Sequence, residues 1–177
     1  MNNYTDKKEY LESLASLNKL VAHNRPLSEG STTNRVSFIP VEDEDGLSTA
    51  ITTGIHFPCV VMMDLSGRFR DLSGSIRKEW SNTIWFLHKG QADSEHEKKR
   101  IAYEMAETVM NQFISKMLND FEEEGSCGPF KDLNINDFFF QMTGDVEDGV
   151  FGWRLSFPDQ INADDITQFD NTKWHDE

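Results

Sequence analysis

Residues 94–125 read "SEHEKKRIAYEMAETVMNQFISKMLNDFEEEG", and most of what the sequence predicts about the fold starts from them. Ser94 and Glu97 form an S-x-x-E capping box, which predicts that a helix begins there. Two apolar rows follow, one from Ile101 and one from Ala102, each with a spacing of four residues. An apolar band this wide is typical of a helix that lies across a sheet. A helix of about 30 residues spans roughly 45 Å, well above the average length.

Strands are expected on both sides of this helix. Before it we expect strands near residues 35–41, 52–64 and 82–89, with a turn at "EDEDG"; after it we expect a hairpin made of "DFFFQMTG" and "VFGWRLSFP". In the second hairpin strand the large apolar residues occupy every second position, which is typical of a strand with one buried face. The four residues at 84–87 are all apolar, which indicates burial on both faces of the sheet.

The order of the elements predicts the class of fold. A first helix is expected at residues 6–23, followed by a polar linker at 27–34. Helix, strands, long helix and hairpin together predict an α+β domain. In it, a mostly antiparallel sheet packs against one long helix, with an N-terminal helix and a C-terminal extension. We expect a single domain at residues 1–158 and an acidic tail at residues 159–177.

Charge is distributed unevenly along the chain. The 177 residues have a net charge of −14, and residues 120–177 contribute −12 of it through 15 acids and 3 bases. Such a field repels nucleic-acid phosphates, which disfavours tight DNA binding by this part of the chain. The sequence has no run of about 18 apolar residues and no signal-peptide pattern, so we expect no membrane span and synthesis in a cytoplasm.

Sequence motifs give no catalytic signature. "MMDLSG" lacks the G-x-S-x-G pattern, "HEKKR" lacks the second histidine of a zinc protease, and the acidic turns fail the calcium-loop pattern. Cys59, Cys127 and five scattered histidines do not form a zinc pattern. We therefore expect no enzyme, no metal and no cofactor. A metal-dependent enzyme that uses Asp64, Asp71 or Glu79 is an open alternative.

Residues 64–77, "DLSGRFRDLSGSIR", repeat Asp-Leu-Ser-Gly after seven residues. Asp, Ser and Gly in this order are typical of turns, so one interpretation is a β-hairpin arm with solvated arginines. A phosphate-binding loop is another. A third is a loop at 64–80 that projects toward a partner. Such a loop would present the kinds of side chain that are enriched in strong interfaces: Arg68, Phe69, Arg70, Arg77 and Lys78.

The acidic tail also carries large apolar residues, namely Ile166, Phe169 and Trp174. Their spacing is too loose for a long amphipathic helix. One interpretation is a tail that packs on its own domain or stays disordered, as chain termini often do. The alternative is a tail that docks into a neighbouring subunit. A basic loop and an acidic C-terminal third in one chain suit head-to-tail self-assembly.

The element order resembles that of the tail-terminator family of tailed phages and of related neck, or head-to-tail connector, proteins. The stretches "FPCVVMMDLSGRFRD", "FFFQMTG" and "GVFGWRLSF" look like virion proteins of crAss-like Bacteroides phages. The resemblance covers roughly residues 5–158 and rests on pattern and order. The acidic tail has no fixed counterpart in that family.

The resemblance implies a structural protein of the virion, assembled in the cytoplasm of the bacterial host. It implies a homo-oligomeric ring, six- or twelve-fold, that contacts neighbouring neck and tail proteins. DNA would pass through the lumen without tight binding, because excess carboxylates near a lumen keep phosphates from being held. The loop at 64–80 and the tail would supply the contacts between subunits, since unlike patches on one chain can close a ring.

A different class of function is also open. An acidic adaptor or inhibitor domain would use the C-terminal third to mimic nucleic acid and bind a basic protein partner.

Overall fold

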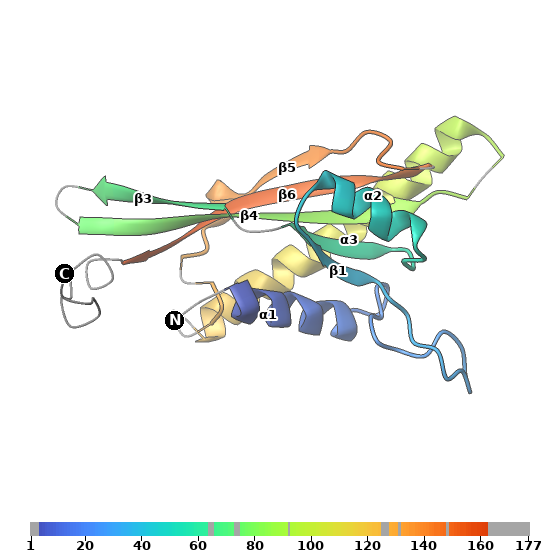
Figure 1. The fold of residues 1–177 in the computed structure, drawn as a ribbon, viewed down its shortest axis with the longest axis horizontal. Coiled ribbons are helices and arrows are strands. Elements are labelled where there is room, and N and C mark those ends of the chain that lie inside the picture. Colours follow the sequence, from blue (N-terminus) through green and yellow to red (C-terminus); the bar gives the residue numbers. More distant parts are fainter. Residues whose placement is uncertain are drawn as a thin grey trace, which may run out of the picture.

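The computed structural model describes residues 4–63, 66–72, 75–91, 93–124, 128–130, 132–147 and 149–162. The elements follow one another along the chain as shown in Figure 1: α1 (Tyr4–Leu17), β1 (Phe38–Val41), α2 (Glu44–Thr52), β2 (Cys59–Met63), β3 (Ser66–Leu72), β4 (Ser75–Lys89), α3 (Glu95–Glu124), a 3-10 turn (Ile135–Asp137), β5 (Phe139–Met142) and β6 (Val150–Asn162). The fold is α+β, with one long helix and an N-terminal helix, as the sequence predicts.

The six strands form one mixed sheet in the order β1-β2-β4-β6-β5, and β3 pairs with β4. Only the β1–β2 pair among these is parallel. One edge of β4 pairs with β6 along residues 77–89. The other edge is shared, since β2 pairs with residues 84–87 and β3 with residues 75–81. The strand expected at 82–89 therefore begins seven residues earlier and carries the hairpin.

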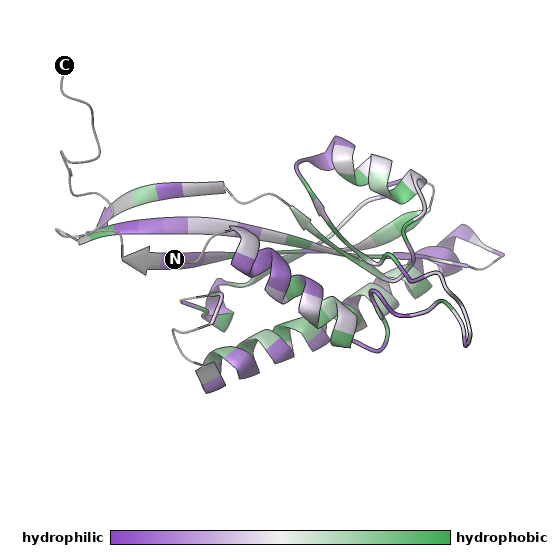
Figure 2. Cartoon of the chain, turned by 60° about the horizontal axis from the view of Figure 1, so that its bottom comes forward, coloured by the Kyte–Doolittle hydropathy of each residue, from purple (hydrophilic) through white to green (hydrophobic). Residues whose placement is uncertain are grey.

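The sheet is buried on both faces in its central part. Ile84 and Phe86 belong to the core between the sheet and the helices α1 and α3. Trp85 and Leu87 belong to a second core beneath α2. All four are at most 8% exposed, which confirms the burial expected from the apolar run. In Figure 2 the hydrophobic residues of α3 lie toward the sheet and the hydrophilic ones away from it.

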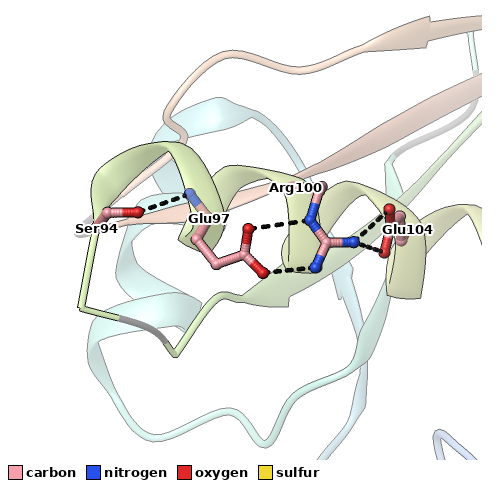
Figure 3. A network of polar contacts seen from close by, with 4 residues as sticks. All are labelled: Ser94, Glu97, Arg100 and Glu104. Carbon is pink, nitrogen blue, oxygen red and sulfur yellow. Dashed lines mark hydrogen bonds and ion pairs between the residues drawn. The ribbon is translucent and has the colours of Figure 1, made fainter.

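Helix α3 begins as the capping motif predicts. The Ser94 hydroxyl accepts a hydrogen bond from the Glu97 N–H at 3.3 Å. The Glu97 carboxylate pairs with Arg100, which also pairs with Glu104, so the first turns carry a ladder of ion pairs (Figure 3). Exposed pairs of this kind contribute little to stability because water and salt screen them. Packing against the sheet, and not this ladder, therefore holds the helix in place.

Helix α2 corrects the expectation of a turn at "EDEDG". Asp43 caps the helix, because its side chain accepts a hydrogen bond from the Gly46 N–H at 2.8 Å. Leu47 and Ala50 are then buried against the sheet. The strand expected at 52–64 is correspondingly shorter, since only Cys59–Met63 pairs with its neighbours. The acidic run resembles a turn because a good helix cap and a good turn residue are the same residue type.

Helix α1 is shorter than the expected range of 6–23. It ends at Leu17, and the Asn18 side chain then accepts a hydrogen bond from the Val21 N–H at 3.1 Å. Ala22 has a φ of 48°, in the left-handed region, so the chain turns away from the helix axis. Val21 still reaches the core, although it lies outside the helix.

Candidate assembly site

β3 and residues 75–81 of β4, which include most of the doubled heptad, pair as antiparallel strands that extend the sheet beyond the helices (Figure 1). We define the arm as β3, residues 75–81 of β4 and residues 158–162 of β6, which pair with one another. No helix of the described chain covers the arm in either of the two views in Figures 1 and 2. A third strand from β6 gives the hairpin the extra pairing that an isolated two-stranded hairpin lacks.

The register of the hairpin divides the candidate interface residues of the arm between its two faces. Arg68 is opposite Glu79, Phe69 is opposite Lys78, and Arg70 is opposite Arg77. Directly opposite residues share a face of a sheet, and successive residues alternate between faces. Phe69 and Lys78 therefore lie on one face and Arg68 on the other. The structure brings these residues onto one arm without gathering them in one patch.

One face of the arm is rich in arginine. Arg68 donates to the Glu79 carboxylate at 2.8 Å, and its side chain is 59% exposed. Such an exposed pair contributes about 0–1 kcal/mol and can be exchanged for a partner's carboxylate. The Nε of Arg77 is buried and has no hydrogen-bond partner among the described residues. Register also places Arg70 opposite Arg77 in the hairpin.

The other face of the arm is aromatic. The Lys78 ammonium lies 4.2 Å from the centroid of the Trp80 ring and 6.0 Å from that of Phe69. Trp80 in turn covers Gly67, where an added Cβ would lie 2.9 Å from the indole. Phe69 is 57% exposed. Cation–π contacts at exposed sites contribute about 0.5–1 kcal/mol, so they order these side chains but leave the Phe69 ring available for contact.

A buried ion pair ties the root of the arm to the body. Lys7 of α1 and Asp159 of β6 are both fully buried, and their charged atoms lie 2.6 Å apart. Lys7 also donates to Asn82 at 3.2 Å, while Asp159 accepts from the Asp132 N–H at 3.1 Å. Burial lowers the pKa of Lys7, and the nearby charge of Asp159 opposes that shift.

This cluster was not foreseen from the sequence. Lys7 reads as a polar residue on the surface of a helix, and Asp159 was assigned to the tail. Strand β6 continues to Asn162, so the first four residues of the expected tail belong to the sheet. A lysine at a position that the helical period places among apolar residues was the available signal.

Strand β5 exposes large apolar side chains, and the sequence analysis did not predict this exposure. Phe139, Phe140 and Met142 are 60%, 54% and 52% exposed. The strand pairs with β6 and with no other described strand. The sequence predicts a strand here but not its position, and in the structure it lies at the edge of the sheet. Exposed aromatic and methionine side chains at an edge are typical of protein interfaces.

A pocket of about 320 Å³ opens beside β5, on the face of the sheet that α2 covers. Trp85, Arg154 and Gln141 form a row across β4, β6 and β5, and Arg154 donates to Gln141 at 2.9 Å. The indole N–H of Trp85 is buried and has no hydrogen-bond partner among the described residues. Glu44 and Asp145 also line the pocket. It offers donors at its floor and carboxylates nearby, which suits binding of a group that carries both an acceptor and a cation.

The other residues that the sequence analysis singled out are either buried in the core or lie outside the described residues. Ile166, Phe169, Trp174 and Cys127 lie outside, as does Asp64. Cys59 is fully buried, which raises the pKa of its thiol.

The residues of the open metal-enzyme alternative do not meet in the described part of the arm. Asp71 is opposite Ile76, whereas Glu79 is opposite Arg68, so the two carboxylates lie on opposite faces of the hairpin. Within the residues that the structure describes, no group of three or more His, Cys, Asp or Glu side chains is placed to hold a metal ion. In the same residues, no helix is both long and apolar enough to cross a bilayer.

Comparisons with family models, curated proteins and solved structures gave no match.

Proposed function

We propose that this chain is a structural, non-enzymatic subunit of a tailed-phage neck or tail, where it assembles as a ring around the DNA channel. The observation that carries the proposal is the arm, which extends the sheet away from the core and displays Arg68 and Phe69 on opposite faces. Arginine and aromatic residues dominate the binding energy of protein interfaces. The resemblance in element order supplies the phage context.

The arm is preorganised for contact. It is paired with β6 and anchored by the Lys7–Asp159 ion pair, so little conformational entropy is left to lose on binding. A loop with the same residues would bind more weakly because its ordering would oppose association. Preorganisation favours assembly over a catalytic role, which would instead need converging reactive groups.

The charge of the chain fits a channel that conducts DNA. A net charge of −14 per copy disfavours retention of phosphates, so DNA would pass without tight binding. The basic residues of the arm would face neighbouring subunits, where carboxylates are abundant, and not the lumen.

Assembly is tested directly on the full chain. Mass photometry and negative-stain microscopy of the purified protein, alone and mixed with the products of the genes adjacent to its own, are expected to show rings of six or twelve copies. A chain that stays monomeric in every mixture overturns the proposal.

The acidic adaptor is a second candidate, favoured by the five acids and no bases in residues 132–149. A stoichiometric one-to-one complex with a strongly basic protein, in place of rings, would support that candidate against the ring.

A further inference from the structure

Among the strands that the structure describes, none pairs with the outer edge of β5. Thr143 donates its N–H to the Gly152 carbonyl at 2.9 Å, which fixes the phase of hydrogen bonding between β5 and β6. In an antiparallel pair the bonded positions alternate. Phe140 and Met142 are out of phase with Thr143, so their N–H and C=O groups point away from β6. An edge of this kind accepts another strand.

The sheet has other edges, and they differ from one another. β1 lies at the far edge, but Pro40 lacks an N–H and blunts it. β3 forms an edge of the arm, contains no proline, and lies on the side of β4 that faces away from β6. β3 and β5 are therefore proline-free edges on opposite sides of one sheet. Two unlike edges on opposite sides can join copies head to tail.

The two edges are also complementary in charge. β3, "SGRFRDL", has two arginines and one aspartate, whereas residues 132–149 around β5 have five acids and no base. Phe69 beside Arg68 would meet the exposed ring of Phe139 or Phe140. A second copy of this chain thus offers, on its β3 edge, the basic residues that the surroundings of β5 lack.

The pocket beside β5 would select which side chains a docking strand can carry. A strand added to β5 directs every second side chain over the face where the pocket opens. The donors of Trp85 and Arg154 suit an acceptor, and the carboxylates of Glu44 and Asp145 suit a neighbouring cation. A strand that docks there directs either an acceptor or a cation toward the pocket, depending on which of its faces meets it. β3 carries Arg68 on one face and Asp71 on the other.

We infer that β5 of one copy pairs with β3 of the next, which makes a continuous sheet across a head-to-tail contact and places a polar side chain in the pocket beside β5. The inference rests on the proposed function, because it assigns the surfaces that close the ring. It goes further by naming both edges and the direction of the contact.

Disulfide trapping between copies tests this pairing. Cys127→Ser removes one native thiol, and Cys59 is fully buried. Single cysteines are then introduced at exposed positions of one edge or the other, and two variants of different mass are mixed and oxidised. The positions are Ser66, Arg68 and Phe69 on β3 and Phe139, Phe140 and Met142 on β5.

The expected product is a link between a β3 cysteine and a β5 cysteine, in at least one of the nine combinations. Links only within one kind of edge would mean a two-fold contact and overturn the inference. Rings from the unmodified chain with no link of any kind would also overturn it, while the proposed function stands. A β3–β5 link at high concentration without stable rings would support the pairing and count against the ring.

Blocking one edge gives an independent readout. Met142→Lys places a charge on the edge that repels the arginines of β3, and we expect the dissociation constant between copies to rise at least tenfold. Thr49→Lys adds the same charge on the exposed side of α2 and is the matched control. Equal assembly of both variants, with circular dichroism unchanged, would overturn the role of β5.

Discussion

Lys7 and Asp159 show how a single pair of residues can fix the geometry of a surface that lies away from it. Two charges are removed from water here, and each must be matched by its partner and by hydrogen bonds to Asn82 and to the Asp132 N–H. Such pairs contribute little net stability but strongly penalise the loss of one member. The pair therefore specifies how β6, and with it the arm, is seated on α1.

Asp159→Asn tests this reasoning. The variant leaves the Lys7 ammonium buried without a carboxylate, so we expect the free energy of unfolding to fall by about 3–5 kcal/mol in urea denaturation. Asp137→Asn removes an exposed carboxylate and is the control, with an expected change within about 0.5 kcal/mol. The double change Lys7→Met with Asp159→Leu should cost less than Asp159→Asn alone. A loss of less than 1 kcal/mol for Asp159→Asn would show that water reaches the pair.

His88 gives the fold a dependence on acid. Burial lowers the pKa of its imidazole below the ordinary value of 6.5. The unfolded chain therefore binds the proton first as the pH falls through 6.5, and stability falls with it until the folded pKa is reached. His88→Phe removes the titration and keeps a ring against Phe57.

Urea denaturation of both proteins at pH 7.5 and pH 5.5 measures the effect. We expect the wild-type chain to lose more stability than His88→Phe over this interval, by less than about 1.4 kcal/mol per pH unit, the bound for one proton. The same loss in both proteins would mean that other groups cause the acid sensitivity.

At the scale of elements, the sequence predicts those whose period is long and uninterrupted. Helix α3 and strand β6 were expected close to their observed places, because a wide apolar band and a strict alternation each admit one interpretation. Helix α2 was not predicted, because its nine residues are too few to show a clear helical period of apolar residues, and its acidic start is also typical of a turn. The helix is stabilised by the packing of Leu47 and Ala50 against the sheet, and this contact is not visible in the local sequence.

Close packing between strands makes a further element-scale prediction at Gly152. A Cβ added there would lie 1.9 Å from the Phe86 carbonyl oxygen of the neighbouring strand β4, and a backbone atom cannot move aside cheaply. We expect Gly152→Ala to lower the free energy of unfolding by about 3 kcal/mol or more. Gly144 is the matched control, because a Cβ there meets nothing within 4 Å. Thermal melting of both variants measures the difference, and equal midpoints would contradict the packing described for β6.

At the scale of the whole molecule, the candidate site was only partly predictable. The repeated heptad predicts a hairpin or a projecting loop at the position of the arm, because turn residues and arginines can be recognised in a sequence. The β5 edge did not, because exposure depends on which strand happens to be outermost, and "DFFFQMTG" has the composition of a core strand. The Lys7–Asp159 pair joins residues 152 positions apart, so no local pattern could reveal it.

Assembly through β3 and β5 predicts an unusual dependence on salt. Each copy carries −14, so copies repel one another at low ionic strength, where the Debye length is about 30 Å at 0.01 M. Near 0.15 M that length is about 8 Å, and the net repulsion fades while arginine–carboxylate contacts across the edges persist. At higher salt those contacts weaken in turn. We therefore expect the tightest association at intermediate salt.

Sedimentation velocity between 0.02 and 0.8 M salt, roughly the range over which screening acts, measures this dependence. From 0.15 to about 0.5 M the dissociation constant should rise roughly threefold or more, as short-range pairs are screened. Arg68→Gln should flatten this upper limb and leave the low-salt limb in place, since it removes a contact but hardly changes the net charge. Association that tightens steadily up to 0.8 M would instead mean that apolar contacts of Phe139, Phe140 and Phe69 dominate the interface, and that the charges of the two edges do not choose the partner.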